Sequence, residues 1–148
     1  MHEGDNMVLT CLYCDDVRLE ADGRSSILGW HAQDVLVAPS SAFPLVLHSL
    51  AVVLLLRLPA GNSVTDLTLK MLVGDEVLYS VTASEQDLQA MLEDAQKAID
   101  AQGAQTIRVV MKFPNLTIPI LGALCYVAKV GESEVRSNPL HIQLQRDD

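Results

Sequence analysis

The longest apolar segment of the chain, Leu45–Leu58, is apolar at both alternating sets of positions from Leu47 onward. A strand formed here must therefore be covered on both faces. A buried helix is the competing interpretation. The segment contains His48, Ser49 and Arg57 and is shorter than the about 20 apolar residues that a membrane-spanning helix needs. We predict a central, buried strand from Leu47 to Leu58.

Composition limits the classes of function. The chain has 148 residues, of which 49% are hydrophobic, and this predicts one globular domain over residues 1–148. Its formal net charge is −9. Such a surface is repelled by nucleic-acid phosphates and by anionic lipids, so neither is an expected partner. An acidic surface suits solubility or a basic protein partner.

The start of the chain, Met1 to Asn6, has neither the basic residues nor the apolar run of a secretory signal. The three cysteines are an odd number and give no disulfide framework. We therefore expect the protein to act in a reducing cytoplasm.

Short apolar segments bounded by turn residues recur along the chain and predict roughly eight to ten strands. Consecutive strands with short connections indicate a mostly β, antiparallel sandwich. The segment Pro114–Pro119 is predicted to be a loop or an edge segment. The predicted strands are Met7–Tyr13, Val17–Glu20, Ser25–Trp30, Gln33–Val37, Leu47–Leu58, a hairpin over Val64–Thr82, Ile107–Phe113, Leu121–Val130, Val135–Asn138 and Leu140–Gln145.

One segment changes from the period of a strand to that of a helix. Apolar side chains at Leu88, Met91, Leu92, Ala95 and Ile99 form a single helical stripe, which predicts one amphipathic helix over about residues 85–102. Two flanking residues fit its ends, Ser84 as N-cap and Gly103 as the residue after the helix.

Several short elements along the chain form a recognisable set. They are Cys14-Asp15, Asp22-Gly23-Arg24, Ile27-Leu28-Gly29-Trp30, Pro44, Arg57, Gly122 with Tyr126, and Asn138-Pro139-Leu140-His141-Ile142. Together they resemble a family of small uncharacterised prokaryotic β-sandwich proteins, a domain-of-unknown-function class. The resemblance covers most of the chain and implies an immunoglobulin-like sandwich, with Ser84–Gly103 as an addition. It implies no activity.

Cys11 and Cys14 form a C-x-x-C motif. Thioredoxin-like chemistry requires this motif at a helix N-terminus, and zinc requires a second pair of ligands. Here the motif lies on a predicted strand, where residues three apart point to opposite faces. Cys125 and the scattered histidines supply no second pair. Structural cysteines are the favoured interpretation, with a metal ligand or a redox role as alternatives.

The other residues that could carry chemistry form no known pattern. His31, His48 and His141 have no H-x-H or H-x-x-x-H spacing, and His48 is predicted to be a hydrogen-bonded core histidine. The serine pairs Ser25-Ser26 and Ser40-Ser41 lack the nucleophile elbow, and the glycines form no phosphate loop. We therefore predict no catalytic residue and no cofactor.

Acidic residues gather in the predicted turns, where loops at one end of a sandwich can bind Ca²⁺. Solvated turn residues are the competing interpretation, since Asp favours turns. These carboxylates are Asp15, Asp16, Asp22, Asp75, Glu76, Glu132 and Glu134.

The segment Pro114–Gly122 is apolar for a loop, and it either meets a partner or covers an open end of the sandwich. Only 20% of the residues are charged, which is low for a small monomer. We therefore expect a non-enzymatic protein-interaction or structural module, which binds a protein partner or forms a homodimer. A role in a larger assembly such as a phage particle is a variant. The alternative is a Ca²⁺ or Zn²⁺ site on the loops, possibly enzymatic.

Overall fold

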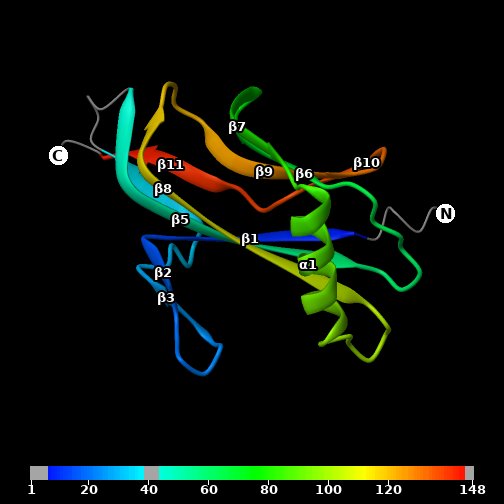
Figure 1. Ribbon diagram of the computed structural model, residues 1–148. Coiled ribbons are helices and arrows are strands. Elements are labelled where there is room, and N and C mark those ends of the chain that lie inside the picture. The colour runs from blue at the N-terminus through cyan, green and yellow to red at the C-terminus, as the bar shows by residue number, and fades with distance from the viewer. Residues whose placement is uncertain (1–6, 39–43, 146–148) are drawn as a thin grey trace.

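The computed structural model describes residues 7–38 and 44–145. Within these residues the protein is mostly β, with one short helix and three sheets (Figure 1). The elements are β1 (Val8–Cys14), β2 (Asp16–Leu19), β3 (Ser25–Leu28), β4 (Val35–Ala38), β5 (Leu45–Leu58), β6 (Thr68–Val73), β7 (Glu76–Thr82), α1 (Glu85–Gln96), β8 (Gln105–Ile118), β9 (Ala123–Val130), β10 (Ser133–Arg136) and β11 (Leu140–Leu144).

The three-stranded sheet has β5 at its centre, paired antiparallel with β1 on one side and with β8 on the other. Leu54 lies opposite Cys11 of β1 and Val109 of β8. It faces the main core, whereas Ala51 and Val53 face a second buried cluster beneath the hairpin β2–β3. The predicted central strand, buried on both faces, is confirmed, and the competing helix is excluded.

The six-stranded sheet has the order β4-β11-β9-β6-β7, and β10 also pairs with β9. The pair β4 and β11 runs parallel, whereas the other pairs are antiparallel. The predicted antiparallel arrangement therefore holds for every described pair of strands except this one. β4 and β11 are far apart in sequence. No tight turn joins them, so nothing requires the pair to be antiparallel. No immunoglobulin-like topology is shown by these sheets, and that part of the expectation stays a prediction.

The two larger sheets pack face to face over one hydrophobic core. The predicted hairpin over Val64–Thr82 is confirmed as β6 and β7, and the inner side chains of β6 are buried. On β7, Tyr79 lies opposite the buried Met71 but is exposed, and a register shift places the exposed Val77 opposite Leu72 of a separate cluster. The six-stranded sheet is wider than the three-stranded one, so its edge strand β7 has little opposite it.

Asn138 joins the two larger sheets through the backbone of β1. Its Oδ1 accepts a hydrogen bond from the Cys11 N–H at 2.8 Å, and its Nδ2 donates to the Cys11 carbonyl at 2.9 Å. The same Nδ2 donates to Asp34 Oδ2 at 3.0 Å. The Tyr13 hydroxyl donates to the Asn138 carbonyl at 2.8 Å. Because β1 is an edge strand, this side chain serves the backbone groups that a further strand would otherwise pair.

Helix α1 begins as the sequence predicts and ends early. The Ser84 side chain accepts a hydrogen bond from the Asp87 N–H at 3.1 Å, which confirms the N-cap. The helix ends at Gln96 rather than near residue 102, and Gly103 lies in a later turn with a φ of 79°. No helix in the described part of the chain is long and apolar enough to cross a membrane.

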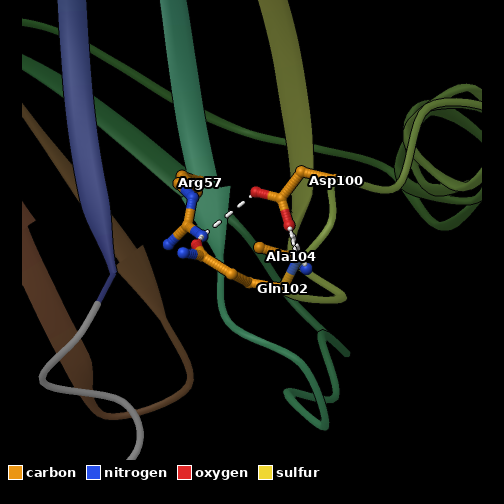
Figure 2. Close-up of polar contacts among 4 residues, drawn as sticks. All are labelled: Arg57, Asp100, Gln102 and Ala104. Carbon is orange, nitrogen blue, oxygen red and sulfur yellow. Dashed lines mark hydrogen bonds and ion pairs between the residues drawn. The ribbon is translucent and has the colours of Figure 1, made fainter.

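Asp100 explains the early end, because its carboxylate binds the backbone locally (Figure 2). It accepts hydrogen bonds from the N–H groups of Gln102 at 2.8 Å and Ala104 at 3.0 Å, and from Arg57 at 3.1 Å. The backbone hydrogen bonds are the main cause that lowers the pKa of Asp100. An aspartate that binds the backbone in this way competes with continued helix. Ile99 is consequently exposed instead of extending the apolar stripe.

Strand β8 continues through the segment that was predicted to be a loop or an edge segment. Pro114 lies opposite Ser49, and pairing with β5 extends to Ile118 opposite Leu45. β8 is an edge strand of its sheet. Proline lacks a backbone N–H and is tolerated on an edge strand, because one side of that strand has no neighbour to pair with. The edge alternative is therefore confirmed and the loop alternative is wrong.

Candidate functional site

The C-x-x-C motif is divided between two buried environments. Cys11 faces the main core and Cys14 faces the cluster beneath the hairpin β2–β3, so the two thiols point to opposite faces as predicted. Burial raises the pKa of Cys11 to about 12 and also raises that of Cys14. Cys125 belongs to a third buried cluster, and all three cysteines are free. Neutral, buried thiols of this kind are poor nucleophiles and poor metal ligands.

Alkaline pH should destabilise the protein through Cys11. Its thiol has an ordinary pKa of 9.0 and a folded pKa of about 12, so above about pH 9 the unfolded chain loses a proton that the folded chain keeps. The free energy of unfolding should then fall by about 1.4 kcal/mol per pH unit from this residue. Urea unfolding from about pH 8 to about pH 11 measures the slope. Cys11→Ala should remain folded and lose free energy less steeply, and equal slopes would contradict the assignment.

The histidines lie apart from one another. His31 is half-buried, with Nε2 3.9 Å from Asp15 Oδ1. His48 is exposed and bonded through Nδ1 to Asn115 Oδ1 at 3.2 Å, so the prediction of a core histidine is wrong. His48 lies in the part of β5 that precedes the pairing with β1, so β1 does not cover it. His141 is exposed on β11.

The acidic turn residues do not converge on one site. Asp16 binds Lys112 at 3.1 Å, and this hydrogen bond is the main cause that lowers the pKa of Asp16. Asp22 pairs with Arg24 inside its own turn. Among residues 7–38 and 44–145, no three histidine, cysteine or acidic side chains come together as metal ligands. The exposed carboxylates are those of Asp15, Asp22, Asp75, Glu76, Glu132 and Glu134.

Neither serine pair is seen to form a catalytic site. Ser25 Oγ accepts a hydrogen bond from Arg108 Nη1 at 3.1 Å, which is a contact between the hairpin and β8. The pair Ser40-Ser41 lies outside the described residues. Among the described residues, no histidine forms a hydrogen bond with the Ser25 hydroxyl.

The apolar segment Pro114–Gly122 is divided between interior and surface. Ile118 is fully buried in the main core, whereas Ile120 and Leu121 are exposed. The segment is therefore partly core and partly exposed, and contact of its exposed part with a partner stays a prediction. Two exposed side chains at the turn between β8 and β9 remain available to a partner.

Further exposed apolar side chains lie on the hairpin β2–β3 and the turn after it, which we name the arm (residues 16–30). Leu19 and Ile27 share the face of the hairpin that carries Val17, Leu28 lies on the opposite face, and Trp30 follows β3. Leu19 is 75% exposed and Trp30 is 54% exposed, and Ile27 and Leu28 are exposed as well. The hairpin is a separate two-stranded sheet that projects from the two larger sheets (Figure 1). The exposure of these side chains was not predicted, because their sequence pattern is that of ordinary strands. The available signal was the concentration of apolar residues, including the only tryptophan, around the Asp22-Gly23 turn.

The arm is held in place at its base and along one side. Val17 is buried against Cys14 and Val53, and Lys112 and Arg108 of β8 bind Asp16 and Ser25. The close turn at Gly29 adds a further constraint. Its φ is 65°, and a Cβ there would collide with the carboxylate of Asp15. The exposed apolar side chains are therefore presented by a positioned element.

Comparisons with known proteins identify the family of the chain. No curated protein matches the chain, and no solved structure matches it. A family of unknown function, DUF6941, matches residues 9–143, which include the arm, both larger sheets and α1. The chain therefore belongs to the DUF6941 family.

Proposed function

We propose that the protein is a non-enzymatic interaction or structural module that binds a protein partner through the arm. The observation that carries this proposal is the exposure of Leu19, Ile27, Leu28 and Trp30 on the arm, whose position is fixed by its contacts. Exposed apolar patches on small proteins mark interaction sites. Tryptophan is also enriched among the residues that dominate binding energy.

The surroundings of the arm support protein as the ligand class. The hairpin has polar neighbours, among them Arg18, Glu20 and Arg24, which fit the polar rim of a protein interface. The hairpin is a two-stranded sheet of short strands, so its outer edges offer backbone groups with which a partner strand could pair.

The free thiols Cys11 and Cys14 support a reducing cytoplasm as the site of action. Among the residues that the structure describes, no three potential ligands come together to favour the alternative of a metal-dependent site.

Affinity capture from native lysate tests the proposal with paired variants. We expect Leu19→Ser/Trp30→Ser to lose the partner that the unmodified protein retains, with affinity reduced about 30-fold or more, as for hot-spot residues. The control is Val77→Ser/Ile99→Ser, which changes two other exposed apolar side chains. Thermal melting confirms that both variants are folded.

The outcome distinguishes a specific surface from general stickiness. If the partner binds the control and not the arm variant, the arm is the interface. If both variants capture the same partner with equal affinity, the proposal is wrong. Loss of the partner from both variants to the same extent also contradicts it, because binding would then follow total apolar exposure.

A further inference from the structure

The outer face of the six-stranded sheet carries a group of cations, which we name the basic face (Lys70, Lys129 and Arg136). Lys70 of β6 and Arg136 of β10 both lie opposite Val127 of β9, one on each side. Lys129 lies two residues further along β9 and points to the same face. Three neighbouring strands therefore present cations within cross-strand distance of one another.

The floor between these cations is apolar. Leu72, Cys125 and Val127 form a buried cluster that is separate from the main core and lies on the outer side of the sheet. Arg136 Nη1 is 3.5 Å from Cys125 Sγ, so the guanidinium lies over this cluster. The aliphatic stems of long basic side chains cover apolar surface in this way while their charges remain in water. The basic face thus combines an apolar floor with a charged rim.

The charge of this face is opposite to that of the protein. The chain has 10 lysines and arginines against 19 acidic residues, and three of those cations are here. Glu134 lies opposite Lys129 on the same face. Within residues 7–38 and 44–145, none of the three cations forms an ion pair shorter than 4.0 Å. The basic face therefore fits an acidic partner surface.

Helix α1 supplies such a surface on the same chain. Its buried side includes Leu88 and Ala95, and its exposed residues include Glu85, Asp87, Glu93 and Asp94. The helix itself contains no lysine or arginine, and Lys97, the residue that follows it, pairs with Asp94 at 3.4 Å and leaves the other three carboxylates unpaired among the described ion pairs. Because α1 packs against β8 of the three-stranded sheet, it does not cover the basic face of its own molecule.

We propose that the basic face of one copy binds helix α1 of a second copy, head to tail. A 12-residue helix is about 18 Å long and about 10 Å wide. Strands β6, β9 and β10 lie about 4.8 Å apart and so span a similar width. The contact joins two different surfaces, so repetition gives a ring or an open filament rather than a closed two-fold dimer. It uses no residue of the arm and goes beyond the proposed function.

Charge reversal at each surface, followed by mixing, tests the contact. The sheet variant is Lys70→Glu/Arg136→Glu and the helix variant is Glu93→Lys/Asp94→Lys, which leaves the first-turn carboxylates in place. The control is Thr10→Glu/Lys112→Glu/Thr117→Glu, which changes the net charge by the same amount as the sheet variant at three exposed positions on β1 and β8 of the three-stranded sheet. Sedimentation velocity measures the size distribution, and thermal melting confirms folding.

At low ionic strength we expect the unmodified protein and the control to form species larger than the 16.1 kDa monomer. Salt at about 0.5 M should dissociate them, because screening weakens exposed charge pairs. Each reversed variant alone should associate about tenfold or more weakly, since like charges then face each other. An equimolar mixture of the two variants should assemble again, because each supplies the charge that the other needs.

Three results would overturn the inference. The unmodified protein remains monomeric at about 100 μM, well above typical specific affinities. The two reversed variants assemble as well as the control. The mixture remains monomeric while the unmodified protein assembles. Association that is lost in Leu19→Ser/Trp30→Ser and kept in both charge variants would assign self-association to the arm, so the two proposals fail separately.

Discussion

Replacing Leu54 by Asp is expected to leave no cooperatively folded protein. Leu54 is 1% exposed and lies at the middle of β5, between Cys11 of β1 and Val109 of β8. A carboxylate at this position has no cationic partner in the main core, and burying an unpaired charge costs more than the about 5–15 kcal/mol by which a typical domain is stable. Circular dichroism and thermal melting should show an unfolded or insoluble chain.

The same substitution on the same strand provides the control. Val46 also lies in β5 but is 44% exposed, so Val46→Asp should change the free energy of unfolding by about 1 kcal/mol or less. If Leu54→Asp is soluble and melts cooperatively, β5 is not the central strand of the core. If both variants unfold, the loss reflects intolerance of charge anywhere in β5 rather than burial of Leu54.

This strand shows why much of the fold can be predicted from the sequence. β5 is apolar at both alternating sets of positions. That pattern requires both faces of the strand to be buried, whichever elements bury them. The hairpin of β6 and β7 was predictable for a related reason, since Leu69 and Met71 alternate with Thr68 and Lys70. In both cases the pattern belongs to the strand itself.

The end of α1 depended on a local competition that periodicity does not detect. Ile99 continues the apolar stripe of the helix, so the pattern predicts helix to about residue 102. Asp100 instead binds the N–H groups of Gln102 and Ala104 and is held by Arg57 of β5. Arg57 is 43 residues away from Asp100 in sequence, so the hydrophobic periodicity of the helix cannot reveal this contact.

The two proposed surfaces were not predictable for a different reason. Leu19, Ile27 and Trp30 are apolar, and sequence alone does not distinguish an exposed apolar side chain from a core one. The basic face consists of Lys70, Lys129 and Arg136, which are brought together only by the pairing of β6 and β10 with β9. Each of these cations taken alone is an ordinary solvated residue of a strand.

Asn138 shows how a short motif can mark a structural role. It begins the Asn138–Ile142 element, one of those on which the family resemblance rests. In the structure its side chain is the hydrogen-bond partner of both backbone groups of Cys11, and its carbonyl accepts from Tyr13. The spacing from Cys11 is 127 residues, so no local pattern predicts the contact. An asparagine suits this role because its side-chain amide both accepts and donates through one planar group.

Asn138→Ala should therefore destabilise the protein by about 2–5 kcal/mol. The substitution leaves the N–H and the carbonyl of Cys11 without their partner, and each unpaired buried backbone group costs about 1–3 kcal/mol. Urea unfolding measures the loss, and hydrogen exchange followed by nuclear magnetic resonance should show faster exchange of the Cys11 amide. Gln143→Ala is the control, since Gln143 is an exposed amide on the neighbouring strand β11.

The size and location of the effect decide between two roles for Asn138. If it replaces a missing strand beside β1, Asn138→Ala is much less stable than Gln143→Ala, and protection is lost first at Cys11. A difference of about 0.5 kcal/mol or less between the two variants would place Asn138 among ordinary surface residues and contradict the role. Tyr13→Phe supplies a further check, because it removes the hydroxyl that donates to the Asn138 carbonyl. If the two contacts act as one junction, the losses in Tyr13→Phe and Asn138→Ala should add to more than the loss in the double variant.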